Sequence, residues 1–195
     1  MATIDWPREL APQSSQLDVA YNDMSFESIF TNYQQVVSFP GAYWTLSMTL
    51  PPLGREKERL LAATMGKLRG RQNTFRFRDY RFLPPSPAGS PVVDGGGQAG
   101  AQLVTRDWTP NSVVLRAADY VTVNNQLLRI TEDVMSGSDG RAILPLNMLL
   151  RASPANGAQI NYLTPYAVMR LVSSSNPMRR QVGQATITLQ AREVF

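Results

Sequence analysis

The sequence predicts an α+β fold that is mainly β, in which a β-sheet host domain with one packed α-helix carries an inserted small β-barrel or sandwich module. Three observations support this fold class. Residues 43–50 alternate between two faces, as a half-buried strand requires. The period of the apolar residues then becomes helical between residues 54 and 70. Short strand patterns separated by tight turns follow between residues 112 and 162.

The strand over residues 43–50 is the centre of the predicted sheet. Its predicted core side holds Trp44, Leu46, Met48 and Leu50, and its opposite side holds Tyr43, Thr45, Ser47 and Thr49. Pro51 and Pro52 end the strand, because proline has no amide hydrogen to donate to a neighbouring strand.

An amphipathic helix follows Gly54, with Leu61, Met65 and Leu68 on one stripe. Burying these three side chains contributes about 5–9 kcal/mol, at about 1.5–3 kcal/mol each. Since a typical domain has a net stability of about 5–15 kcal/mol, this stripe is expected to determine the fold. Gly70 is expected to be the left-handed residue that ends the helix.

Residues 75–78 alternate again and predict a returning strand, with Phe75 and Phe77 on one face and Arg76 and Arg78 on the other. The surrounding segment is rich in arginines and aromatic residues, namely Arg69, Arg71, Arg76, Arg78 and Arg81 with Phe75, Phe77, Tyr80 and Phe82. A basic face beside aromatic rings is a candidate for binding a nucleic-acid backbone. We favour the alternative, in which the aromatics pack beneath the helix and the arginines lie at a protein interface.

Residues 1–24 predict an extended arm, because prolines and a polar run discourage regular structure there. Trp6 and Leu10 are expected to anchor this arm on a neighbouring surface, and a frayed terminus is the alternative. Residues 26–39 predict one or two further strands, followed by a turn at Pro40-Gly41.

A change of composition follows Phe82. Residues 84–91 are proline-rich and predict a linker or long loop. The short strands expected after this loop are residues 112–115, 120–123, 126–131, 142–146 and 158–162. Tight turns are predicted at Asn124-Asn125 and at residues 138–140.

Two further strands are predicted at residues 167–172 and 185–194, and the second alternates regularly. Its simplest partner is the sheet around residues 43–50. The host domain would then be residues 1–83 plus 165–195, and the inserted module would be residues 84–164. One continuous β-rich domain is the alternative, and the Pro/Gly-rich stretch favours insertion.

Gly95-x-Gly97-x-x-Gly100 matches the spacing of the dinucleotide-binding fingerprint. That fingerprint requires a strand before it and a helix after it, and neither is predicted here. Residues 101–109 are too short for the helix before Pro110. The motif is therefore interpreted as a flexible loop, and no cofactor is expected.

Composition excludes several kinds of catalytic site. The 195 residues contain no cysteine and no histidine, so they hold no thiolate or imidazole metal site, Ser-His-Asp triad or Cys-His nucleophile. The carboxylates show no calcium-ligand spacing, and a glycosidase pair of carboxylates distant in the chain stays open. We expect no catalytic residue, no metal site and no enzyme. We also expect no signal peptide and no membrane insertion, because no apolar run reaches the roughly 18 residues of a span.

Six short runs carry a resemblance to a known family. They are GAYW at residues 41–44, LPPL at 50–53, LRG at 68–70, ADYV at 118–121, DGRA at 139–142 and LRASPANG at 150–157. In this order they resemble the distal tail proteins of long-tailed phages. The similarity covers most of residues 35–172, and its motifs consist of turn and strand residues without catalytic chemistry.

The resemblance implies a structural protein of the virion tail tip, made in the host cytoplasm, that forms a ring, usually a hexamer. Such rings join the tail tube protein to the hub and fibre proteins that meet the host. The resemblance also implies that the inserted module is an OB-like barrel, which is a candidate for glycan binding. In this chain the candidate assembly interface is Tyr43, Thr45, Ser47, Arg76, Arg78 and Arg81. A saccharide- or nucleic-acid-binding β-barrel protein is the alternative function, and an enzyme is the third.

Overall fold

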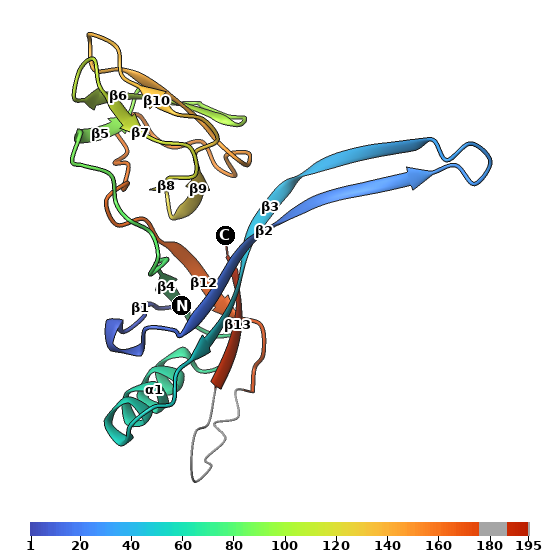
Figure 1. Cartoon of the computed structure of the whole chain (residues 1–195), viewed down its shortest axis with the longest axis vertical. Helices are drawn as coiled ribbons and strands as arrows, with labels where there is room; N and C mark the ends of the chain where they lie inside the picture. Colours follow the sequence, from blue (N-terminus) through green and yellow to red (C-terminus); the bar gives the residue numbers. More distant parts are fainter. Residues whose placement is uncertain (176–186, 195) are drawn as a thin grey trace.

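The computed structural model describes residues 1–175 and 187–194, which form sheets and one α-helix (Figure 1). Six strands make the largest sheet, in the order β1-β4-β12-β13-β3-β2. Their bounds are Thr3–Asp5 (β1), Ser14–Glu27 (β2), Gln34–Leu50 (β3), Thr74–Phe77 (β4), Ala167–Leu171 (β12) and Ile187–Glu193 (β13). Both ends of the chain thus contribute to one sheet. The α+β, mainly β fold class is confirmed.

One face of this sheet is buried, as the alternation of residues 43–50 predicts. The core residues predicted on this strand, namely Trp44, Leu46, Met48 and Leu50, are all buried. On β13, Leu189 stands opposite Met48 and Ala191 stands opposite Leu46, and both are buried too. The alternating pattern of β13 therefore continues the core that β3 begins.

The strand predicted for residues 185–194 pairs with β3 in antiparallel fashion from Ile187 to Arg192, as expected. Residues 185 and 186 lie outside the described part of the chain. The strand predicted at residues 167–172 is β12, and it lies between β13 and β4.

The helix α1 spans Arg55–Leu68. Of its predicted core stripe, Leu61 and Leu68 are buried and Met65 is partly buried against the same cluster. The prediction for the helix end was off by one residue, because Arg69 already has a left-handed backbone with φ of 49°. Gly70 follows with φ of 65°, and a Cβ there would lie 2.9 Å from the carbonyl oxygen of Ser174. Glycine is therefore required by a close approach of backbone.

The N-terminal segment is ordered, so the alternative of a frayed terminus is wrong. The expected lack of regular structure is wrong as well, because residues 14–24 belong to the strand β2. β1 pairs in parallel with β4, and a short 3-10 helix (η1, Arg8–Leu10) follows. The two predicted anchors, Trp6 and Leu10, are buried. The Trp6 ring lies 5.2 Å from that of Phe75, and its Nε1 donates a hydrogen bond of 3.0 Å to the Leu10 carbonyl oxygen.

The turn predicted at Pro40-Gly41 is wrong, because both residues lie inside β3. The chain reverses instead at residues 28–33, which makes β2 and β3 a single long hairpin (Figure 1). Pro40 and Gly41 form an irregularity in the ladder, where the register passes from Ala20 opposite Tyr43 to Asn22 opposite Phe39. Gly41 has φ of 110°, a conformation that side-chain-bearing residues rarely adopt.

Residues 84–164 contain three small sheets, which are β11-β6-β5, β10-β7 and β8-β9. The strands are Gly89–Val93 (β5), Gln102–Trp108 (β6), Val113–Leu115 (β7), Tyr120–Val123 (β8), Gln126–Arg129 (β9), Val134–Met135 (β10) and Ala142–Pro145 (β11). Three isolated bridges supplement these sheets, and the described residues form no single closed barrel. The OB-like barrel is therefore not confirmed, while the tight turn at Asn124-Asn125 joins β8 to β9 as predicted.

Two segments of this module differ from their predictions. Part of the predicted proline-rich linker is β5, in which Pro91 is tolerated because β5 is an edge strand. Residues 158–162 form only isolated bridges, of Gln159 with Val92 and of Asn161 with Thr122. The glycine-rich motif joins the antiparallel strands β5 and β6, so no helix follows it and the fingerprint context is absent.

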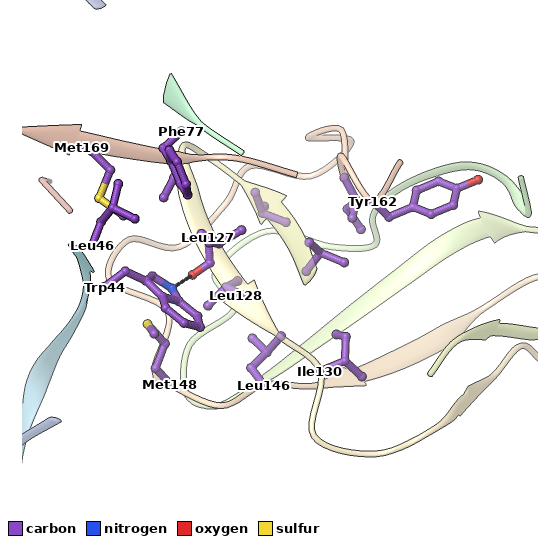
Figure 2. Packing of buried hydrophobic residues seen from close by; sticks show 14 of the residues in the cluster. Trp44, Leu46, Phe77, Leu127, Leu128, Ile130, Leu146, Met148, Tyr162 and Met169 are labelled. Atoms are coloured by element: carbon purple, nitrogen blue, oxygen red, sulfur yellow. Dashed lines mark hydrogen bonds between the residues drawn. The ribbon is translucent and has the colours of Figure 1, made fainter. Parts of the chain in front are cut away.

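The module and the large sheet share one hydrophobic core (Figure 2). The buried Trp44 ring meets the ring of Tyr120 edge-on at 5.7 Å, and Tyr120 meets Phe82 at 5.6 Å. Trp44 Nε1 donates a hydrogen bond of 2.8 Å to the carbonyl oxygen of Leu127. Within the described ranges, no helix has the length and apolar character needed to cross a membrane.

Candidate assembly surfaces

The polar face of the large sheet carries the first group of predicted interface residues. Tyr43, Thr45 and Ser47 alternate with the buried residues of β3 and are partly exposed. Thr45 stands opposite Asp18 on β2 and opposite Arg192 on β13. We call this surface the open face, and its central residues are Gln16, Asp18, Tyr43, Thr45, Ser47, Thr188, Gln190 and Arg192.

The predicted arginines occupy different environments. Arg76 lies on β4 and is engaged within the chain, because Nη1 pairs with Asp5 at 3.5 Å and the guanidinium lies 5.2 Å from the ring centre of Tyr166. β4 ends at Phe77, so Arg78 does not share a strand face with Arg76 as predicted. Arg78 and Arg81 are exposed.

Two of the four aromatic residues of the same segment belong to the core. Phe75 and Phe77 are buried in the same core cluster as Leu61 and Leu68 of α1. Their rings are therefore closed to stacking with bases, which is the contact that a single-stranded nucleic acid requires.

The most exposed apolar surface was missed by the sequence-based prediction. Beyond Gly41, the outer parts of β2 and β3 leave the sheet as a two-stranded ribbon of residues 22–27 and 34–39 (Figure 1). Among the described residues, no further strand pairs with this ribbon. Its backbone edges and both of its faces are therefore open to solvent or to a partner.

The register of the ribbon defines two unlike faces, because residues that pair across antiparallel strands share a face. The apolar face holds Met24, Phe26, Val37 and Phe39, together with Asn22 and Gln35. The other face holds Asp23, Ser25, Glu27, Gln34, Val36 and Ser38. Of the four apolar residues on the first face, Met24, Phe26 and Phe39 are exposed and Val37 is partly exposed.

The tip of the ribbon adds three large side chains to this surface. Ile29 is 87% exposed, Phe30 is 91% exposed and Tyr33 is 73% exposed. The Ser28 amide donates a hydrogen bond of 2.9 Å to the carbonyl oxygen of Tyr33, and Asn32 has a left-handed backbone with φ of 53°. The tip is thus an ordered turn that presents apolar side chains to solvent.

A signal for the ribbon is present in the sequence. Met24 and Phe26 alternate with polar residues, and so do Val37 and Phe39. The intervening segment contains Ser28, Thr31 and Asn32, which are ordinary turn residues. Pro40-Gly41 is a stronger local turn signal than these residues, so the sequence favours a chain reversal at Pro40-Gly41.

A groove of about 790 Å³ lies at the other edge of the large sheet, beside β1. Three segments line it, namely the N-terminal segment, the end of β4 with the turn after it, and the chain returning from the module. Its apolar lining is Trp6, Pro7, Ala11, Phe82, Pro84, Leu163 and Pro165. Its charged lining is Asp5, Arg8, Arg76, Arg78 and Asp79.

Two carboxylates and three guanidinium groups line this groove, so its lining carries a net charge of +1. Asp5 pairs with Arg76, and Asp79 accepts a hydrogen bond of 2.9 Å from the Arg81 amide. Within the described residues, Arg8 and Arg78 form no ion pair. The lining is therefore slightly positive.

Tyr80 also lines the groove, and its hydroxyl donates a weak hydrogen bond of 3.4 Å to the Pro7 carbonyl oxygen. Burial raises the pKa of the Tyr80 phenol, and the nearby Arg8 guanidinium partly opposes this rise. Tyr80 is thus a neutral hydrogen-bonding group between the apolar lining and the arginines. No group of three or more acidic side chains in the described residues is arranged to hold a metal ion.

No protein-family model matches the sequence, and no curated protein sequence matches it. The open face, the ribbon and the groove are therefore the structural observations from which a function can be argued.

Proposed function

We propose that this chain is a structural subunit of a ring, of six copies, at the tail tip of a long-tailed phage. The ring joins the tail tube to the hub and the host-recognition fibres. The observation that carries this proposal is the ribbon, whose apolar face and tip are exposed in the single chain. The resemblance of most of residues 35–172 to phage distal tail proteins is the reason for placing this ring in a phage tail.

A partner for the ribbon is required on physical grounds. A two-stranded ribbon is marginally stable in water unless a further strand or layer supports it. Contiguous exposed apolar surface of this kind marks an interaction site. Phe30 and Tyr33 are of the residue types that are enriched at protein interfaces. Since the ribbon has no cover within the described chain, another chain is assigned to cover it.

The open face supports a second contact, with the tail tube. It is broad and polar, with exposed groups such as Asp18, Gln190 and Arg192 beside Thr45 and Ser47. A polar surface of this kind suits an interface that forms late between preassembled parts, because it stays soluble before assembly. The module of residues 84–164 is assigned to the hub and fibre side, where a glycan is a further candidate ligand.

Light scattering coupled to gel filtration tests the ring, together with negative-stain images. The expected particle has about six times the 21.6 kDa mass of one chain and a central opening, alone or with the tube protein. A strictly monomeric chain in both conditions would contradict the proposal.

A truncated variant tests the role of the ribbon. Asn22 and Phe39 are register partners, so replacing residues 23–38 with Asn-Gly closes the hairpin with a two-residue turn. We expect this variant to keep the circular dichroism spectrum of a folded β protein and to remain monomeric. A saccharide- or nucleic-acid-binding protein would instead keep its ligand affinity after this truncation.

A further inference from the structure

The ribbon and the groove occupy opposite edges of the same sheet. β2, which forms one strand of the ribbon, is one edge strand, and β1, which lies beside the groove, is the other. In Figure 1 the ribbon points away from β1, so its tip is directed away from the groove of its own chain. A contact between these two surfaces therefore joins one copy to another in a head-to-tail manner, which generates a ring when the rotation closes.

The two surfaces also match in chemistry. The tip presents Ile29, Phe30 and Tyr33, and the groove has an apolar lining that includes Trp6 and Leu163. The groove volume of about 790 Å³ falls within the range of about 300–1,000 Å³ that encloses a compact ligand, so it has room for the tip side chains.

Their charges are complementary as well. Residues 22–39, which make up the ribbon and its tip, contain two acidic residues, Asp23 and Glu27, and neither lysine nor arginine. The groove lining has three arginines, Arg8, Arg76 and Arg78, against the two carboxylates Asp5 and Asp79, so its net charge is +1. An acidic ribbon entering a positive groove is favoured over contact between two ribbons, which would bring like charges together.

From these observations, and resting on the proposed ring, we infer that the ribbon tip of each copy seats in the β1-side groove of the next copy. Phe30 is the central anchor, and Trp6, Phe82 and Leu163 form its receiving surface. Arg8 and Arg78 of the receiving copy face the acidic side chains of the entering ribbon.

Cysteine cross-linking tests this contact directly, because the chain has no cysteine of its own. One preparation carries Phe30→Cys and another carries Leu163→Cys. After equal mixing, assembly and mild oxidation, we expect a cross-linked species of twice the 21.6 kDa chain mass on a non-reducing gel. Each variant alone is expected to stay at the mass of one chain. Met135→Cys, placed at an exposed site on the module, is the matched control for Leu163→Cys and is expected to give no cross-link with Phe30→Cys.

The outcomes separate this contact from the ring itself, whose mass is measured on the same mixtures. Rings without a Phe30–Leu163 cross-link would overturn the inferred contact and leave the ring proposal standing. A cross-link in Phe30→Cys alone would show tip-to-tip pairing and would also overturn it, as would equal cross-linking to Met135→Cys. Absence of both rings and cross-links would overturn the ring proposal and the contact together.

Truncation of the anchor gives an independent measurement. Phe30→Ala changes an exposed side chain, so the isolated chain is expected to fold as before. If Phe30 is a central anchor, its loss raises the concentration at which half of the chains assemble by at least about 30-fold. Met135→Ala removes a similarly exposed side chain and is expected to leave that concentration unchanged. Equal effects of the two variants in sedimentation velocity would contradict the anchor role.

Discussion

Arg151 Nη2 donates a hydrogen bond to Glu193 Oε2 and forms an ion pair that joins the module to the last strand of the sheet. The Glu193 side chain is fully enclosed, with 0% of its surface exposed. Its carboxylate also accepts hydrogen bonds of 3.2 Å from the amides of Trp44 and Leu127. Arg151 donates a further hydrogen bond of 3.0 Å to the Ala42 carbonyl oxygen. One buried carboxylate thus ties together β13, β3 and β9.

Removing one partner of this pair is expected to be strongly destabilising. Arg151→Met leaves the Glu193 carboxylate buried without its cation, which costs about 3–5 kcal/mol in the free energy of unfolding. Arg116→Met is the control, because its pair with Asp133 is exposed and contributes about 0–1 kcal/mol. Urea unfolding measures the change in the free energy of unfolding for both variants. Arg151→Met combined with Glu193→Gln is expected to lower the free energy of unfolding less than Arg151→Met alone. A larger loss in the double variant would contradict the role given to the Arg151–Glu193 pair.

A charge beneath the helix is expected to prevent folding. Leu61 is buried on α1, so Leu61→Asp places an unpaired carboxylate in the core and should abolish soluble expression. Ala62→Asp changes the next residue, which is exposed, and is expected to express normally. Circular dichroism of a native-like Leu61→Asp protein would contradict the packing of α1 on the sheet.

The insertion of residues 84–164 into the host remains a prediction with a direct test. Pro84 and Pro165 line the same groove, so the chain leaves and returns at neighbouring points. We expect residues 84–164 to fold alone, and we expect a Gly/Ser linker from Leu83 to Pro165 to leave a folded host. Proton NMR spectra with dispersed amide signals would support both. Two disordered fragments from a folded parent would instead indicate one domain, held together by the core around Trp44.

Tyr120, which packs between the module and the large sheet, is expected to make the free energy of unfolding depend on pH in the alkaline range. Desolvation by burial raises the pKa of its phenol above the ordinary value, although Arg129 opposes this. The resulting stability is fully present below the unfolded-state pKa of about 10 and is lost as pH rises through the folded-state pKa. Tyr120→Phe keeps the ring and removes the titration. Its free energy of unfolding should therefore fall less between about pH 9 and pH 11.5 than that of the parent chain. Parallel pH profiles in urea unfolding would contradict this assignment.

Charge exchange is expected to show which side chains meet at the ribbon contact. Arg78→Glu repels the acidic ribbon of the next copy and should slow assembly several-fold at low salt, with less effect at high salt. Arg78 is preferred to Arg76 for this test, because Arg76 is held by Asp5 and Tyr166. Adding Glu27→Arg should restore part of the rate in stopped-flow light scattering, and a further loss would contradict the pairing.

The regular elements were predictable because their signals are local. The alternation of residues 43–50, the stripe around Leu61 and the strand at residues 187–193 each report directly on one buried face. β5 was missed because Pro91 is a poor strand residue except at a sheet edge, and the position of an edge depends on the whole topology.

The candidate interface was less predictable for a similar reason. The open face followed from the pattern of one strand, so Tyr43, Thr45 and Ser47 were placed correctly on a polar surface. The environment of Arg76 depends on Asp5 and Tyr166, which are distant in sequence and meet it only in the fold. The ribbon depends on where the chain reverses, and the local preference of Pro40-Gly41 for a turn was overridden by pairing along the whole length of β2 and β3.

The continuity of β3 has a mechanical consequence. This strand runs as one backbone from the solvent-exposed ribbon to the centre of the sheet, with β2 on one side and β13 on the other. Tension applied to the ribbon would pass along the strand axis, so the hydrogen bonds on both sides of its inner half would resist together in shear. The irregularity at Gly41 would yield first, by bending. In such a subunit the ribbon can change direction under load while the inner half of β3 keeps its register.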